Sequence, residues 1–235
     1  MFKLTEIIDG YKLVKRINTY TGLVSKGTSQ EKAFISNPGR MTELLVKDAP
    51  VYIRKTSNPK RKTPYDLFAI KPKQPIVCID SRVPNWIFED HLTNDKIKEL
   101  KGYEIKKREY KIGNSRIDYL LENNKDGKCL VELKLCTLVE NEKILFPDAV
   151  SKRSSKHLLD LISATKQGYR AIVYFIGLRG DPTSFGPNEK VDPKFKETFD
   201  QTLDSEVELY ALKTEVKYGQ KMLEFSDLEE IAVKP

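Results

Sequence analysis

The stretch that decides the fold is residues 116–135, "RIDYLLENNKDGKCLVELKL", which reads as two apolar strands joined by a turn. The turn includes Gly127, which adopts a positive φ without strain, so this segment predicts a β-hairpin. Three charged residues interrupt the strands, because Asp118, Glu132 and Lys134 stand where a buried strand normally carries Leu or Val. Charges at such positions are costly unless a partner group or a metal ion compensates them.

The register of this hairpin determines whether the two acids meet. If the turn centres on Lys125, Asp118 pairs with Glu132 and their Cβ atoms lie roughly 5 Å apart. Lys134 then shares their sheet face, because side chains two residues apart point the same way. Opposed carboxylates repel unless a cation lies between them, and Mg²⁺ takes oxygen ligands of this kind. A turn displaced by one residue would move Asp118 to the other face.

Two interpretations of these charges therefore stay open. In the first, the acids bind a metal ion and Lys134 stabilises negative charge that develops during a reaction. In the second, Glu132 and Lys134 form an ion pair on a half-exposed sheet, and Arg116 satisfies Asp118. The Glu-x-Lys pattern occurs five times in the chain, but only this copy, in "CLVELKLC", is apolar on both sides.

Composition indicates the class of partner. The 235 residues include 41 Lys and Arg against 34 Asp and Glu, which gives a net charge of +7. A basic balance favours polyanions such as nucleic acid, although a lysine-rich enzyme surface would produce the same count. The sequence contains no nucleotide-binding glycine motif, so no nucleotide cofactor is expected.

The expected environment of the chain is the cytoplasm. No run of about 18 apolar residues predicts a membrane span, and the first residues lack the apolar stretch of a signal peptide. Cys78, Cys129 and Cys136 form no metal-binding or redox motif, so they are expected to be buried, reduced thiols. A homo-oligomer is left open.

The pattern of the chain changes near residue 82. Residues 1–82 read as short strands separated by Gly, Pro, Asn and Ser, which predicts a small β-barrel domain. Residues 83–235 alternate helices with strands and predict an α/β domain. Its expected helices begin at Pro84, lie within 148–168 with Asp148 as the N-cap, and cover 192–203; its expected strands cover 103–112, 115–122, 128–136, 169–178 and 207–216.

Several longer motifs resemble one known family. "NPGRMTELL", "SNPKRKTPYDL", "NSRIDYLL", "VELKLCTLVE" and "LFPDAVSKRSSKHLLDLI" occur in order along the chain, and they are similar to the sugar fermentation stimulation protein family. The resemblance implies an α+β fold, with an N-terminal OB-like β-barrel and a C-terminal PD-(D/E)XK nuclease-like α/β domain built on a mixed sheet. It also implies DNA binding of low sequence specificity and a regulatory role in sugar (maltose) metabolism.

The resemblance also implies roles for particular residues. Asp118 and Glu132 would bind Mg²⁺ or Mn²⁺ and act in catalysis together with Lys134, and Glu89 would be an auxiliary metal ligand. Three positions in two segments depart from the family pattern. The loop 36–41 reads Ser-Asn-Pro-Gly-Arg-Met where the family commonly has Pro-Asn-Thr-Gly-Arg-Met, and Leu135 stands where the family commonly has Asn.

The expected DNA contacts are basic residues in three places. Arg40 lies in the loop 36–41, and the barrel loop "RKTSNPKRKTPY" adds a basic set; the C-terminal domain contributes Lys156 and His157. The members of the basic set are Lys55, Lys60, Arg61 and Lys62. The alternatives are a solvated loop, a structural ion pair for Arg40 and a helix-surface position for His157.

Two functions follow from these readings. One is a DNA-binding, Mg²⁺-dependent phosphodiesterase that uses Asp118, Glu132 and Lys134. The other is a DNA-binding regulator that keeps a nuclease-like fold without turnover.

Overall fold

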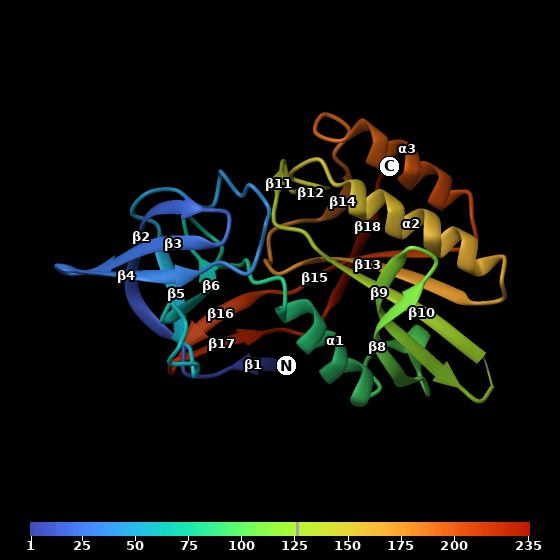
Figure 1. Ribbon diagram of the computed structural model, residues 1–235, viewed down its shortest axis with the longest axis horizontal. Coiled ribbons are helices and arrows are strands. Elements are labelled where there is room, and N and C mark those ends of the chain that lie inside the picture. The colour runs from blue at the N-terminus through green and yellow to red at the C-terminus, as the bar shows by residue number, and fades with distance from the viewer. Residues whose placement is uncertain (126) are drawn as a thin grey trace.

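The computed structural model describes residues 1–125 and 127–235, and Figure 1 shows that they form two lobes. The N-terminal lobe is an OB-like barrel of five strands, which pair in the order β4-β3-β2-β5-β6 and close through β4 and β6, with the short β7 beside β6. Leu13, Val24, Ile53 and Leu67 fill its interior. The bounds are β2 (Ile8–Asn18), β3 (Thr21–Lys26), β4 (Ser29–Phe34), β5 (Pro50–Lys55), β6 (Tyr65–Ile70) and β7 (Val77–Cys78). The expected barrel is confirmed.

The C-terminal lobe is built on a mixed sheet in the order β11-β12-β14-β18-β15-β13-β10-β9-β8. Its strands are β8 (Glu104–Ile112), β9 (Ser115–Asn123), β10 (Gly127–Leu135), β11 (Val139–Glu140), β12 (Lys143–Phe146), β13 (Arg170–Gly177), β14 (Ser184–Pro187), β15 (Glu208–Lys213) and β18 (Glu229–Val233). Its helices are α1 (Val83–Thr93), α2 (Lys152–Thr165) and α3 (Pro193–Leu203), with a 3₁₀ turn η1 (Lys98–Leu100) after α1. The expected mixed sheet is confirmed.

The central strand β13 explains why both faces of this sheet are covered. Its side chains alternate between two cores: Tyr174 packs with residues of α1, whereas Val173 and Phe175 pack with residues of α2 and α3. In Figure 1, α2 and α3 lie together over one side of the lobe and α1 lies apart from them. A strand buried on both faces must be almost continuously apolar, as β13 is.

The N-terminal strand pairs with a hairpin from late in the chain to form a small separate sheet. β1 (Phe2–Leu4) pairs with β17 (Met222–Phe225), which pairs with β16 (Val216–Gly219). The expected division into domains 1–82 and 83–235 therefore remains a prediction, and β1 pairs across it. Among the described residues, no helix is long and apolar enough to cross a membrane.

One expected helix boundary is wrong. α2 begins at Lys152, and its N-cap is Ser151, whose hydroxyl accepts a hydrogen bond from the amide of Ser154. Asp148, the expected cap, accepts a hydrogen bond from the amide of Met41 instead (3.2 Å) and so joins the C-terminal lobe to the barrel. The expected state of the cysteines is confirmed, since Cys78, Cys129 and Cys136 are unpaired and buried.

Candidate functional site

The β9–β10 hairpin has the register that the sequence predicts. Gly127 pairs with Asn123, and the pairing continues to Val131 opposite Tyr119, so the next position brings Glu132 opposite Asp118. The amide of Asp118 donates to Glu132 Oε2 (3.3 Å), and the amide of Leu133 donates to Asp118 Oδ2 (2.8 Å). The two acids are therefore adjacent and tied to each other's strands.

Glu132 is almost completely buried and is held by two basic side chains. Its Oε1 contacts Lys134 Nζ at 2.5 Å and His157 Nδ1 at 2.6 Å. Burial alone would raise the pKa of this carboxyl, but the positive charge of Lys134 and the contact with His157 outweigh burial. The pKa of Glu132 is consequently lowered to about 2, and the carboxylate stays ionised.

The pKa of Asp118 is shifted in the opposite direction to that of Glu132. Burial and the neighbouring negative charge of Glu132 raise its pKa to about 7, against the hydrogen bond from the Leu133 amide and the charge of Lys134. Two neighbouring carboxylates that titrate this far apart are characteristic of functional sites and of sites for a cation. The interpretation of Glu132 and Lys134 as a half-exposed surface pair is wrong, because their side chains are only 3% and 11% exposed.

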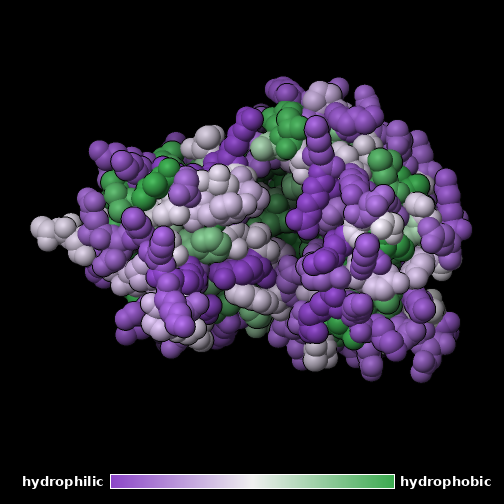
Figure 2. All heavy atoms as spheres, viewed as in Figure 1, coloured by the Kyte–Doolittle hydropathy of each residue, from purple (hydrophilic) through white to green (hydrophobic). Residues whose placement is uncertain are grey.

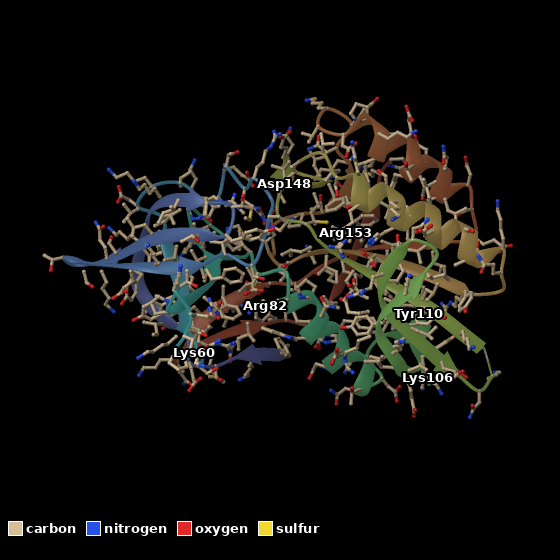
Figure 3. The ribbon with its side chains drawn as sticks, viewed as in Figure 1. Lys60, Arg82, Lys106, Tyr110, Asp148 and Arg153 are labelled. Atoms are coloured by element: carbon tan, nitrogen blue, oxygen red, sulfur yellow. The ribbon has the colours of Figure 1, made fainter. Side chains whose placement is uncertain are left out.

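A cavity of about 420 Å³, which we call the acid cavity, opens above Asp118. Arg82, Glu109 and Arg153 also line it. Figure 3 shows Arg82 and Arg153 in the region where the two lobes meet. Arg82 already pairs with Asp80 and lies 3.6 Å from Asp66, whereas Arg153 has no carboxylate partner among the described residues. An anionic ligand in this cavity would therefore meet mainly Arg153, and a cation would meet Asp118 and Glu109.

Glu109 is a site residue that the sequence analysis missed. It lies on β8 between the paired positions Arg108↔Tyr119 and Tyr110↔Ile117, which places it opposite Asp118. The signal was present, because the two-residue turn Gly113-Asn114 fixes this register as firmly as the β9–β10 turn fixes the other. Glu109, Asp118 and Glu132 thus occupy adjacent positions on three neighbouring strands, with Glu109 at a positive φ of 51°.

Arg153 is the second residue that was missed. Its Nε donates to His157 Nε2 (3.3 Å), so the hydrogen-bond pattern assigns the ring proton to Nδ1, which donates to Glu132. Arg153 and His157 are four residues apart on α2, a spacing that predicts contact on one helix face. Arg153 also lines a groove of about 390 Å³ between the lobes, together with Pro38, Lys134 and Phe146. Figure 2 shows a hydrophobic hollow between the lobes.

Glu89, the expected auxiliary ligand, is engaged elsewhere. Both of its carboxylate oxygens accept hydrogen bonds from Arg108 (2.8 Å each), and the hydroxyl of Tyr119 donates to the same carboxylate (3.0 Å). Arg108 accordingly lowers the pKa of Glu89. Across residues 1–125 and 127–235, no group of three or more acidic, His or Cys side chains is arranged to hold a metal ion.

The donor set nevertheless fits a divalent cation in part. Asp118 supplies a half-buried carboxylate and Glu132 a buried one, on adjacent strands. Burial and the charge of Glu132 raise the pKa of Asp118, and a cation beside it would favour its ionised form. Asp118 and Glu132 are therefore the residues that would hold Mg²⁺ or Mn²⁺, and Glu89 would join them only after release from Arg108.

The expected DNA contacts of the barrel differ among themselves. Arg40, Lys55, Lys60 and Lys62 are exposed. Arg61 forms an ion pair with the buried Asp66 (3.0 Å) and packs over the ring of Phe34, so its charge is already used within the barrel. In Figure 3, Lys60 lies at the edge of the barrel lobe, well away from Arg153.

The two expected contacts on α2 also differ. Lys156 is exposed and donates to the carbonyl of Asn114 (2.7 Å). His157 is only 3% exposed, which contradicts both the helix-surface alternative and an unobstructed contact with phosphate. Its ring instead connects Glu132 to Arg153.

The fold and site together define a two-lobed protein, in which an OB-like barrel precedes a mixed-sheet lobe that carries an opposed pair of acids beside a lysine. Comparison with known proteins identifies the family. The model of the sugar fermentation stimulation protein RE domain matches residues 82–220, and that of the SfsA N-terminal OB domain matches residues 14–79. The chain belongs to the sugar fermentation stimulation protein family.

Individual relatives agree with this assignment. A sugar fermentation stimulation protein homolog of Moorella thermoacetica is 37% identical over 86% of this chain and 88% of its own length. The homolog of Clostridium novyi is 34% identical over 94% of this chain and 95% of its own. The structure of Pyrococcus furiosus SfsA in complex with Ca²⁺ superposes with a TM-score of 0.91 at 31% identity, covering 100% of this chain and 98% of that chain.

Proposed function

We propose that this protein binds DNA with low sequence specificity and cleaves phosphodiester bonds with a divalent metal ion, Mg²⁺ or Mn²⁺. The observation that carries the proposal is the opposed pair of the half-buried Asp118 and the buried Glu132. Lys134 contacts Glu132, and Asp118 lines the acid cavity together with Arg82 and Arg153. Acids followed by a lysine on adjacent strands are the arrangement expected of a PD-(D/E)XK nuclease-like site. The relative from Pyrococcus furiosus, solved with Ca²⁺, supports binding of a divalent cation.

Each side chain has a role that its surroundings allow. Asp118 and Glu132 would hold the metal ion, which would supply Lewis-acid activation of the phosphodiester and of a water molecule. Lys134, 11% exposed and in contact with Glu132, would stabilise the negative charge that develops on phosphate oxygens. His157 keeps Glu132 oriented through its Nδ1 proton. Arg153 would neutralise the phosphate in the acid cavity, and Arg82 would contribute less because Asp80 and Asp66 already pair with it.

Binding to the duplex would use charges outside the acid cavity. The exposed lysines of the barrel loop, Lys55, Lys60 and Lys62, and the exposed Arg40 would contact phosphates without reading sequence. The net charge of +7 supports such a role, since phosphate neutralisation releases counterions.

The test is cleavage of supercoiled plasmid and of single-stranded DNA with Mg²⁺ or Mn²⁺. Wild-type protein is expected to cut, and Glu132→Ala is expected to lose at least a hundredfold of the rate, because both the metal ligand and the partner of Lys134 disappear. Lys194→Ala is the matched control, since Lys194 is exposed on α3 and pairs only with Glu197 among the described residues. Absence of cutting by the wild type, or equal cutting by Glu132→Ala, would refute the catalytic function.

A second candidate function is a DNA-binding regulator without turnover. The observation that favours it is the pair of hydrogen bonds from Arg108 to both carboxylate oxygens of Glu89. With these bonds in place, Glu89 would not be available as a third carboxylate ligand for a metal ion. DNA binding that is unaffected by Glu132→Ala, together with no cleavage under any divalent cation, would support this alternative.

A further inference from the structure

A cavity of about 550 Å³ lies next to the candidate site, and we call it the basic cavity. It opens between the β8–β9 turn and the first turns of α2, and its cations are Arg116, Lys152, Arg153 and Lys156. Among the described residues, the one carboxylate paired with any of these cations is Glu109, which lies 4.0 Å from Arg116 Nε. The positive charge of the basic cavity is therefore mostly uncompensated.

Ser115 provides an independent sign that the basic cavity receives a ligand. This serine lines the cavity and is 5% exposed; its Oγ is closed to solvent and has no hydrogen-bond partner among the described residues. An unpaired buried hydroxyl costs about 1–3 kcal/mol, so proteins seldom keep one without a use. An acceptor oxygen of a ligand would satisfy it after a small adjustment of the cavity wall that exposes the Oγ.

One hydrogen bond connects the two sides of the basic cavity. The turn Gly113-Asn114 positions Ser115 opposite Ile112, and Lys156 Nζ ties α2 to that turn through the Asn114 carbonyl (2.7 Å). Lys152, Arg153 and Lys156 project from the start of α2, where the helix dipole also favours an anion.

We propose that the basic cavity binds a phosphate group of the nucleic-acid strand, next to the phosphodiester that lies at Asp118 and Glu132. This inference rests on the proposed function for the identity of the strand. A phosphate carries several strong acceptor oxygens, so it can engage the Arg116 fork, the lysines and the Ser115 hydroxyl together. Arg153 lines both the basic cavity and the acid cavity, which makes the two cavities adjoining sites for one strand.

Thermal unfolding with inorganic phosphate tests the site without any catalysis. At constant ionic strength, replacing chloride by 20 mM phosphate is expected to raise the Tm of the wild type by about 2 °C or more. Ser115→Ala is expected to have an unchanged or higher Tm without phosphate, because it removes an unpaired hydroxyl, and to lose at least half of the phosphate shift. Lys152→Ala is expected to lose a similar share of the shift.

The control is Lys166→Ala, which removes an exposed lysine just past the last residue of the same helix and should keep the full shift. No shift in the wild type, or an undiminished shift in both Ser115→Ala and Lys152→Ala, would overturn the site. A Tm of Ser115→Ala well below that of the wild type without phosphate would also overturn it, because the hydroxyl would then have a structural partner.

Oligonucleotide binding, measured by fluorescence anisotropy, identifies the source of the phosphate. If a 5′-phosphorylated strand binds wild type at least threefold more tightly than its 5′-hydroxyl form, and Ser115→Ala removes the difference, the site takes a strand end. If Ser115→Ala weakens both forms equally, the site takes an internal phosphate. No effect of Ser115→Ala on either strand refutes the proposal. Ser115-dependent phosphate binding in a protein that never cuts DNA would refute the nuclease function and leave the phosphate site standing.

Discussion

Asp118 and Glu132 are linked through the backbone: the Asp118 amide donates to Glu132 Oε2, while Asp118 Oδ2 accepts from the residue that follows Glu132. Each carboxyl therefore helps to hold the other strand in register. Of the two acids, only Glu132 is in direct contact with Lys134 and His157, which favour its ionised form. Asp118 lacks these contacts, so burial and repulsion from Glu132 raise its pKa. The two acids therefore differ in ionisation at neutral pH: Glu132 is ionised, and Asp118 is near its protonation midpoint.

The raised pKa of Asp118 predicts how stability depends on pH. The folded protein retains this proton up to about pH 7, whereas an unfolded Asp releases it near pH 3.9. The contribution of Asp118 to the free energy of unfolding is therefore greatest below about pH 4 and is lost as the pH rises to 7. The shift limits this loss to about 4 kcal/mol. Asp118→Asn, which cannot ionise, is expected to be more stable than wild type at pH 8 and no more stable at pH 4.

Urea unfolding in EDTA at these two pH values measures the difference. Adding Mg²⁺ or Mn²⁺ at pH 8 should stabilise the wild type and leave Asp118→Asn unchanged, because a cation compensates only an ionised carboxylate. A variant less stable than wild type at pH 8 would show that the carboxylate is not under electrostatic stress.

The sequence predicted the hairpin, its register and the adjacency of Asp118 to Glu132 because a short turn and the two-residue alternation of strands determine all three. The side chains that contact Glu132 were harder to predict from the sequence. Lys134 shares its strand, but His157 lies 25 residues away and reaches Glu132 only because α2 packs on the sheet. Such a contact depends on tertiary packing, which local patterns do not encode.

Tertiary contacts also explain why other sequence predictions differ from the structure. Residue type alone predicts Asp148 as the N-cap of α2. In the structure, the carboxylate of Asp148 instead accepts a hydrogen bond from the amide of Met41 in the other lobe. Arg61 looked like its lysine neighbours in a basic loop, and only the fold brings Asp66 and Phe34 against it. Glu109 was the exception, since its position followed from a two-residue turn visible in the sequence.

His157 is expected to control the ionisation of Glu132. His157→Ala removes the hydrogen bond to Oε1 and leaves a gap beside a buried carboxylate, so the pKa of Glu132 should rise from its lowered value. The expected loss of stability is about 2–4 kcal/mol at pH 7, measured by urea unfolding. His157→Gln, whose amide can donate to Glu132, should recover part of the loss. Equal stability of both variants and the wild type would show that the histidine does not hold Glu132.

We expect the residues of the basic barrel loop to have two different roles: the exposed lysines bind DNA, and Arg61 stabilises the fold. Lys60→Ala and Lys62→Ala are each expected to reduce the slope of log affinity against log salt by roughly 0.9 on duplex DNA and to leave stability unchanged. Arg61→Ala is expected to lower stability by about 1–2 kcal/mol, because the buried Asp66 loses its closest charged partner. Fluorescence anisotropy at several salt concentrations, with urea unfolding of each variant, provides both measurements. An unaltered slope in both lysine variants would remove this loop from the DNA interface.

Gly39 is expected to control the contact between the two lobes. A Cβ at Gly39 would lie 2.6 Å from Asp148 Oδ2 and 3.0 Å from Asn37 Oδ1, so the side chain of Asp148 would have to move. Gly39→Ala should therefore weaken the hydrogen bond from the Met41 amide to Asp148 and cost about 1–3 kcal/mol of stability. Asp148→Ala removes the obstructing carboxylate, so the double variant should be more stable than the sum of the single effects predicts. Urea unfolding of all four proteins completes the cycle, and strict additivity would show that Gly39 and Asp148 do not interact.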